Sequence, residues 1–400
     1  LTSWKVKTAV LTHPFWQCHR LPRGAAWTTV PTLDALAGAT GGMERSPRAD
    51  IMQADPSLES LLEPAALSAL LGRRVERVDR ESYEPAGWSS TEAVFEGVRL
   101  DGEAAPSLLA TTVRREHDWV AVATDDVVDR EVRCWESGLL DRLPRPMRHV
   151  MVGAARTDRG YSLLMHEISR WLVRNTTESL TSRRDHVLVL DALAAMHAGF
   201  WKDTSLHERS LGLASLAAFI GHTSPSSIEK VRHRGATSEV LDFAEEGWRR
   251  LPYVTDPSFA ADVEWLAEDP ALVARAAERL PWTLVHADAR SANVGIDDAG
   301  RVILLDWARP IVGPPTIDLA YWLFGGNQHG SVPHDELIDA YAGSLRGRLG
   351  LRLGDGAWEA LVGLGLLAVF VPMSPFIARF QPEATTWWME RVRPELLALG

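Results

Sequence analysis

The feature that most constrains this chain is a polar segment set among short apolar runs near residue 290. Two apolar residues, 284–285, lead into a loop that carries Asp288 and Asn293. Two β-type runs within 294–305 then flank an Asp-Asp-Ala-Gly turn, and Asp306 ends the second run. The glycine of that turn supplies the positive φ that such a hairpin needs. A strand, a polar loop and a hairpin in this order are expected to bring three oxygen-bearing side chains to one cleft.

That set of side chains suits phosphoryl transfer. One carboxylate can orient or deprotonate a hydroxyl, while an amide oxygen and a second carboxylate can hold Mg²⁺, which prefers oxygen ligands and commonly shares them with substrate phosphates. Phosphoryl transfer needs mainly positioning and charge neutralisation, and kinase catalytic loops divide the work in this way. The competing interpretation is that Asp288, Asn293 and Asp306 only form turns and caps. Their order, spacing and β context favour the catalytic interpretation.

The pattern His286-x-Asp288-x-x-x-x-Asn293, followed by Asp306-Trp307, resembles the catalytic and metal-binding segments of the aminoglycoside phosphotransferases and their protein-kinase-like relatives. The later Gly313-Pro-Pro-x-x-Asp318 resembles the segment that follows the metal-binding aspartate in that family. The resemblance covers roughly residues 60 to 330, and generic helices follow.

The resemblance implies an α+β, protein-kinase-like two-lobe fold, with a small β-rich N-lobe and a larger helical C-lobe. It implies Asp288 as the catalytic base, Asn293 and Asp306 as magnesium ligands, and Asp318 as a structural anchor. Arg290, in the same loop, is a second catalytic candidate that either stabilises charge or simply pairs with an acid. The implied cofactors are Mg²⁺ and ATP or GTP, and the implied acceptor is a hydroxyl of a small molecule.

Composition narrows the class of protein further. The formal net charge of -11 argues against a nucleic-acid partner. Two cysteines, Cys18 and Cys134, give neither a disulfide framework nor metal-ligand spacing, so a reducing cytoplasm is expected. The longest apolar run, 360–373, stops at Pro372 and is shorter than the ~18–20 residues of a membrane helix. We therefore expect a buried helix there and no membrane association. The sequence leaves the oligomeric state open.

The chain divides into three predicted parts. Residues 1–55 lack a sustained period and are interpreted as an N-terminal extension or disordered arm, with a folded cap on the first lobe as the alternative. Residues 56–166 are the expected N-lobe, with a helical stretch at 56–71 that Pro64 breaks in two, strands at 75–78, 93–100 and 108–113, a helix at 129–140, and strands at 149–154 and 161–165. Residues 167–400 are the expected helical C-lobe, with helices at 187–201, 240–251, 270–280, 318–324, 335–349, 358–371 and 385–397.

Candidate nucleotide contacts fall on three segments of the predicted N-lobe. Gly87, Ser89 and Ser90 lie where a phosphate-covering hairpin is expected, but any turn has a similar composition. Glu131 begins the helix that would carry the carboxylate partner of a strand lysine. Met165 lies in a segment that resembles the hinge, whose backbone would bond an adenine ring. A core strand followed by a loop explains that segment equally well.

The lysine that kinase-like enzymes carry on the third strand is absent from this chain. No lysine occurs between residues 7 and 202, and the strand position holds Thr111 or Thr112. Arg114 and Arg115 lie just beyond. An arginine can reach phosphate, but its planar fork differs from an ammonium, so the exchange is not conservative.

Three interpretations follow from the missing lysine. In the first, the protein is a phosphotransferase in which an arginine or another cation replaces lysine, and the γ-phosphate of a nucleotide moves to an antibiotic or secondary metabolite. In the second, it is a pseudokinase that binds a nucleotide or a partner without transfer. In the third, the cleft performs nucleotide-independent chemistry on a small molecule. Fold alone does not decide among them, and the intact Asp288, Asn293 and Asp306 favour the first.

Overall fold

A computed structural model of the chain describes residues 57–84, 93–350 and 354–399. The predicted extension at 1–55 lies outside the described residues, and so do Gly87, Ser89 and Ser90 of the predicted phosphate-covering hairpin. The limits drawn between the three predicted parts stay predictions.

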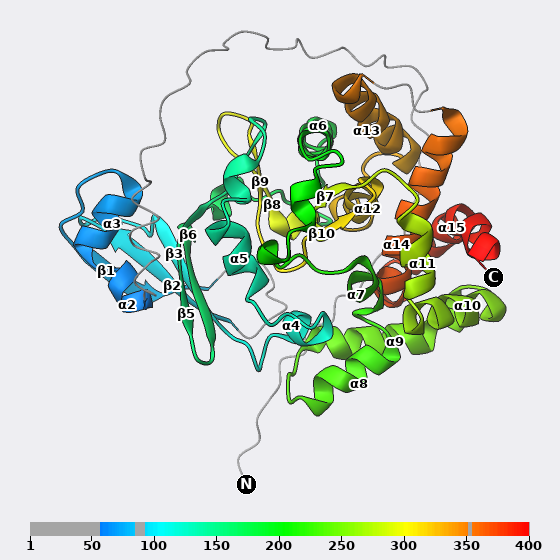
Figure 1. The fold of residues 1–400 in the computed structure, drawn as a ribbon, viewed down its shortest axis with the longest axis horizontal. Helices are drawn as coiled ribbons and strands as arrows, with labels where there is room; N and C mark the ends of the chain where they lie inside the picture. Colours follow the sequence, from blue (N-terminus) through cyan, green and yellow to red (C-terminus); the bar gives the residue numbers. More distant parts are fainter. Residues whose placement is uncertain (1–56, 85–92, 351–353, 400) are drawn as a thin grey trace. The chain divides into compact units, whose positions relative to one another are not determined.

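Five antiparallel strands form one sheet, in the order β1-β2-β3-β6-β5 (Figure 1). Their bounds are β1 (Val78–Ser82), β2 (Ala93–Leu100), β3 (Leu108–Arg114), β5 (Met151–Thr157) and β6 (Gly160–His166). The first strand begins three residues later than predicted, because the pairing with β2 starts at Val78 opposite Leu100. Val75 instead packs into the core beneath the first helices.

The alternation of side chains along the strands gives the sheet two different faces. Leu108 and Ala110 of β3, with Leu164 of β6, pack in one cluster with residues of α2 (Leu58–Leu61) and α3 (Pro64–Leu71). The alternate residues of β3, Leu109, Thr111 and Val113, line a cavity on the opposite face. Pro64 at the first position of α3 separates the two helices as predicted.

Helix α5 (Arg130–Glu136) is shorter than the predicted 129–140. Gly138, with a φ of 74°, follows its end, and a separate 3-10 turn at Leu140–Arg142 continues the chain. A short helix that the sequence analysis did not predict, α4 (Trp119–Ala123), precedes α5 and begins where the Asp118 side chain accepts from the backbone N–H of Ala121.

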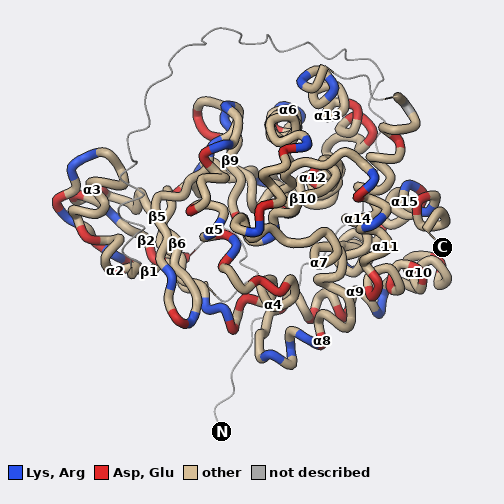
Figure 2. Tube along the Cα trace, in the orientation of Figure 1, with Lys and Arg blue, Asp and Glu red and all other residues tan. Residues whose placement is uncertain are grey.

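The rest of the chain is mainly helical (Figure 1). The helices are α6 (Arg183–Gly199), α7 (Leu216–Gly221), α8 (Pro225–His233), α9 (Glu239–Val254), α10 (Pro257–Glu268), α11 (Ala271–Ala277), α12 (Thr316–Tyr321), α13 (His334–Leu349), α14 (Asp355–Phe380) and α15 (Thr385–Leu399). Short strands β7 (Thr283–Val285) and β10 (Ile311–Gly313) pair with each other, and β9 (Val302–Leu304) pairs with both β4 (Met147–Arg148) and β8 (Val294–Ile296). Acidic and basic residues are interspersed along these elements (Figure 2).

The prediction that α14 ends at Pro372 is wrong, since the helix runs through Pro372 and Pro375 to Phe380. A proline at 375 removes the N–H that would bond the carbonyl of Val371. The hydroxyl of Ser374 donates to that carbonyl at 3.0 Å, and the hydroxyl of Thr223 donates to the carbonyl of Pro372 at 2.7 Å. The first of these bonds satisfies the carbonyl that Pro375 leaves without its helical N–H partner, and the second joins the helix to the residue before the N-cap of α8.

By length and composition, Gly356–Phe380 is long and apolar enough to cross a membrane. Within this structure, however, 83% of its most apolar 18-residue window is buried inside the protein. It packs against α9, α12 and α15, which is the behaviour of a core helix. The expectation of a buried helix at 360–373 is confirmed.

The crossing of α9 and α14 depends on one glycine. A Cβ atom added at Gly247 of α9 would clash with the backbone of Pro375 in α14. We expect Gly247→Ala to destabilise the protein by about 1–3 kcal/mol, because overpacking outweighs the gain in helix propensity. The measurement is the free energy of unfolding in urea.

Gly343→Ala in α13 is the matched control for that prediction, because a Cβ atom there would meet nothing within 4 Å. This exchange is expected to stabilise the protein by about 0.5–1 kcal/mol through helix propensity alone. Equal changes in the two variants would show that the α9–α14 contact does not require glycine.

Candidate active site

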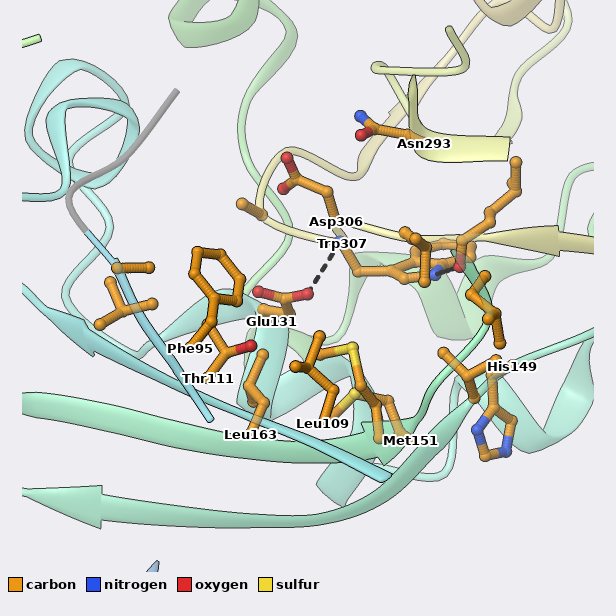
Figure 3. A pocket seen from close by; sticks show the side chains of 18 of the residues that line it. Phe95, Leu109, Thr111, Glu131, His149, Met151, Leu163, Asn293, Asp306 and Trp307 are labelled. Atoms are coloured by element: carbon orange, nitrogen blue, oxygen red, sulfur yellow. Dashed lines mark hydrogen bonds between the residues drawn. The ribbon is translucent and has the colours of Figure 1, made fainter. Parts of the chain in front are cut away.

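A cavity of about 230 Å³ lies between the face of the sheet that carries Thr111 and the loop that follows β7 (Figure 3). Strands β3 and β6, helix α5 and the residues after β9 supply its walls. Most of its lining is apolar, including Phe95, Leu109, Met151 and Leu163. An apolar cavity with a few converging polar groups is typical of a small-molecule or cofactor site.

The loop after β7 is fixed by a buried carboxylate. Asp318, on α12, accepts from the backbone N–H groups of His286 at 2.9 Å and Ala287 at 2.8 Å. Ala287 has a φ of 62°, a conformation that a residue with a Cβ rarely adopts. His197 on α6 bonds the same carboxylate at 3.1 Å and also meets Tyr341 at 2.6 Å. The structure thus gives Asp318 the contacts of an anchor for this loop.

Asp288 lies at the centre of the loop and is 1% exposed. One carboxylate oxygen accepts from the amide of Asn293 at 2.7 Å and from the guanidinium of Arg309, and the other lies 3.2 Å from Nε of Arg290. Burial opposes ionisation of this carboxyl, but the two guanidinium groups outweigh it and hold the pKa of Asp288 below its ordinary value. Asp288 is therefore an ionised carboxylate enclosed by cations.

Asn293 directly precedes the predicted hairpin and Asp306 directly follows it, and both side chains face the cavity (Figure 3). The side-chain amide nitrogen of Asn293 donates to Asp288, so the side-chain carbonyl oxygen of Asn293 is the atom that can bind a ligand. Among the described residues, the carboxylate of Asp306 has no hydrogen bond or ion pair, and its backbone has a φ of 62°. These two oxygen donors fit Mg²⁺ that completes its coordination with phosphate and water.

The backbone at Arg290 packs closely against the segment that follows α12. The chain after α12 forms a π-helix, Trp322–Gly326, and a Cβ atom at Gly325 would lie 2.5 Å from Cβ of Arg290. The hydroxyl of Ser291 also donates to the carbonyl of Gly325 at 3.0 Å. Among the described residues that line the cavity, Arg290 is the only lysine or arginine.

The structure decides which threonine stands at the lysine position. Thr111 lines the cavity, whereas the hydroxyl of Thr112 lies 2.9 Å from that of Ser162 on β6. The arginines just beyond do not line the cavity: Arg114 is exposed, and Arg115 is paired with Asp129 at 2.8 Å. The hypothesis that one of these two arginines replaces the lysine is not supported by this geometry.

Glu131, without a lysine partner, points into the cavity and accepts from the backbone N–H of Trp307 at 3.3 Å (Figure 3). Desolvation, reinforced by repulsion from Asp306, raises the pKa of Glu131 to about 8. Desolvation likewise raises the pKa of Asp118, another cavity residue, to about 6. This side of the cavity is therefore rich in carboxyl groups, and no lysine is among the described residues that line it.

Met165 lines the cavity near the end of β6, where the hinge was predicted.

Two residues of the site were missed by the sequence analysis. Arg309, three residues after Asp306, pairs with Asp288, and Asp118 caps α4 at the cavity wall. The signal for Asp118 was present, because an aspartate before an apolar helical run is typical of an N-cap. The pairing of Arg309 depends on a fold contact that no local pattern carries.

A family model described as "Phosphotransferase enzyme family" matches residues 105–353, more than half of the chain. The chain belongs to this family. The predicted α+β fold, with a β-rich part followed by a larger helical part, is confirmed by the order of the elements. A comparison with curated protein sequences finds no match.

Several solved structures are similar to this chain. Aminoglycoside phosphotransferase APH(3'')-Id from Streptomyces rimosus is 16% identical, with 72% of this chain and 92% of that chain covered and a TM-score of 0.41. Spectinomycin phosphotransferase APH(9)-Ia, in complex with ADP and spectinomycin, is 10% identical, with 82% and 93% covered and a TM-score of 0.42. Choline kinase LicA from Streptococcus pneumoniae is 13% identical, with 86% and 99% covered and a TM-score of 0.42.

The anchor at Asp318 can be tested through stability. Asp318→Asn removes a buried charge from two backbone N–H groups and His197, and we expect a loss of about 3 kcal/mol. Asp335→Asn is the control, because Asp335 forms an ion pair with Arg391 whose side chains are 61% and 44% exposed. That change should cost less than about 1 kcal/mol. Similar losses in urea unfolding for both variants would contradict the anchor.

Because the pKa of Glu131 is raised, the free energy of unfolding is expected to depend on pH. The folded protein keeps this proton up to a pH of about 8, whereas the ordinary pKa is 4.5. Between these values the unfolded chain releases the proton first, so stability falls as the pH rises. We expect the melting temperature of Glu131→Gln, relative to wild type, to increase from pH 4.5 to 8 and then level off.

Thermal unfolding in a chelating buffer from pH 5 to 9 measures this difference. Glu383→Gln, at an exposed carboxylate, is the control, and its difference from wild type should not follow the pH. A flat difference for Glu131→Gln would show that the carboxyl is solvated in the folded protein.

Proposed function

We propose that this chain transfers the γ-phosphoryl group of a magnesium nucleotide to a hydroxyl of a small molecule. The observation that carries the proposal is the convergence of Arg290, Asn293 and Asp306 at one wall of a single cavity, with Asp288 buried behind them in contact with Arg290 and Asn293. Kinase-like phosphoryl transfer requires a residue that orients the acceptor, oxygen ligands for magnesium and a fixed positive charge. The family membership of the chain agrees with this reaction class.

The reaction assigns a role to each residue. The bond between the γ-phosphorus and its bridging oxygen breaks, a bond from the acceptor oxygen to phosphorus forms, and a nucleoside diphosphate leaves. Asp288 orients the acceptor hydroxyl and receives its proton as the new bond forms. Asn293 and Asp306 would hold the Mg²⁺ that neutralises the phosphates. A low pKa at Asp288 is compatible with a late proton transfer, since a loose transition state needs little prior deprotonation.

Access to Asp288 requires one side chain to move. Both of its oxygens are occupied, and Arg290 occupies the one that Arg309 and Asn293 leave. We propose that Arg290 turns toward the nucleotide phosphates when they bind and so frees that oxygen for the acceptor hydroxyl. Arg290 would then supply the positive charge that the strand lacks and would link nucleotide binding to exposure of the base.

Nucleotide binding is the first test. We expect Mg²⁺ with ATP or GTP to raise the stability of the wild type by about 2.7 kcal/mol at a hundred times the dissociation constant, measured by thermal unfolding. Asp306→Asn, which tolerates a positive φ, should lose most of this rise. Asp298→Asn, at a 77% exposed position of the same hairpin, should retain it. No rise with either nucleotide in the wild type would overturn the proposal and favour nucleotide-independent chemistry in the cavity.

The role of Asp288 is tested with the acceptor that a screen of hydroxyl compounds identifies. Asp288→Asn keeps the shape of the side chain, so we expect the magnesium-nucleotide rise in stability to remain while turnover is lost. Nucleoside diphosphate release and phosphorylated product are both measured. Undiminished turnover in Asp288→Asn would exclude it as the base.

A further inference from the structure

The cavity wall at the lysine position carries oxygen atoms where a kinase-like enzyme would have an ammonium. Thr111 is only 7% exposed, and its hydroxyl has no hydrogen-bond partner among the described residues. Glu131 points into the same part of the cavity, with one backbone N–H as its partner (Figure 3). A buried hydroxyl without a partner is unfavourable, because it has lost its hydrogen bonds to water and gained none in exchange.

The surroundings of this pair favour a cation. Asp118, Glu131 and Asp306 line the cavity, and their charges raise the cost of ionising one another. The only lysine or arginine among the described lining residues is Arg290, in the loop after β7. Nucleotide phosphates placed in this cavity would face carboxyl groups on the α5 side, and their negative charge would oppose ionisation of these groups further unless a cation lay between them.

We propose that Glu131 and Thr111, together with the phosphates of the nucleotide, bind a divalent cation that takes the place of the strand lysine. This cation, Mg²⁺ in the cell, is additional to the one expected at Asn293 and Asp306. The inference rests on the proposed function, because the nucleotide supplies part of the coordination. No bond is made or broken by this cation; it neutralises and positions the phosphates.

The coordination chemistry supports magnesium held jointly by protein and nucleotide. Mg²⁺ is usually bound by one or two carboxylates together with substrate phosphates and water, and seldom by a complete cage of protein ligands. Within the described part of the chain, no group of three or more histidine, cysteine, aspartate or glutamate side chains is arranged to hold a metal by itself. A hydroxyl together with a carboxylate is also the set of protein ligands that P-loop NTPases offer to magnesium. The site is therefore completed only when the nucleotide is present.

The sheet register explains why Thr111 and not Thr112 serves this site. The two threonines lie on opposite faces of β3, and Thr112 already shares a hydrogen bond with Ser162. Thr112→Val thus offers a matched control on the same strand, outside the proposed site. Thr111→Val keeps the side-chain shape and removes only the oxygen, and Glu131→Gln removes only the charge.

The test counts bound Mn²⁺, a paramagnetic substitute for Mg²⁺, by electron paramagnetic resonance on the full chain. The imido analogue of ATP, which cannot transfer its γ-phosphoryl group, is the nucleotide probe. We expect Glu131→Gln to bind one Mn²⁺ fewer per bound nucleotide than the wild type. Thr111→Val should bind this last Mn²⁺ roughly ten-fold more weakly, and Thr112→Val should match the wild type. Thr111→Lys should bind the nucleotide with one Mn²⁺ fewer, because its ammonium would replace the cation.

Each other outcome has a distinct meaning. Equal numbers of Mn²⁺ per nucleotide in the wild type, Thr111→Val and Glu131→Gln would overturn the second cation and leave the proposed phosphotransferase intact. Mn²⁺ bound at Glu131 without nucleotide would overturn the joint coordination. Failure of the wild type to bind the analogue with Mn²⁺ would overturn both proposals. Circular dichroism of each variant confirms that it is folded before the cations are counted.

Discussion

The site depends on the buried carboxylate of Asp318. It holds two consecutive backbone N–H groups, those of His286 and Ala287, and it does so while Ala287 is in the left-handed region. Such a conformation persists only where its surroundings determine it. Because Asp288 is the next residue, this one carboxylate sets the direction in which the candidate base leaves the strand.

A second constraint is the uneven distribution of charge around the cavity. The loop after β7 carries the guanidinium of Arg290, and Asp288 behind it is enclosed by cations. The side formed by α4 and α5 carries carboxyl groups, whose pKa values are raised mainly because they are desolvated. In a kinase-like site a lysine would bridge these two regions. The described lining of the cavity has no such lysine, and in our proposal a cation beside Glu131 takes its place.

Much of the architecture could be predicted because the signals are local. The turn at Asp101-Gly102 and the turn ending at Gly300 have the positive φ angles that their residues favour, and Pro64 separates two helices. Helices α8 and α10 carried equally local signals that were overlooked, since each begins with a capping side chain followed by proline. The continuation of the helix past Pro372 could not be predicted, because the hydroxyl of Ser374 satisfies the carbonyl that Pro375 frees and a hydroxyl from a residue 149 positions away bonds the carbonyl of Pro372.

The sequence by itself determined the order of the lobes, the placement of Asp288, Asn293 and Asp306 around one strand, loop and hairpin, and the absence of a strand lysine between residues 7 and 202. These follow from local conformational preferences and from residue identity. Only the tertiary structure decided that Thr111 faces the cavity, that Asp129 engages Arg115 away from it, and that Arg309 encloses Asp288. Which side chains of a strand face the cavity, and which partners long side chains find, is decided by packing between segments that are distant in the chain. No local pattern encodes that packing.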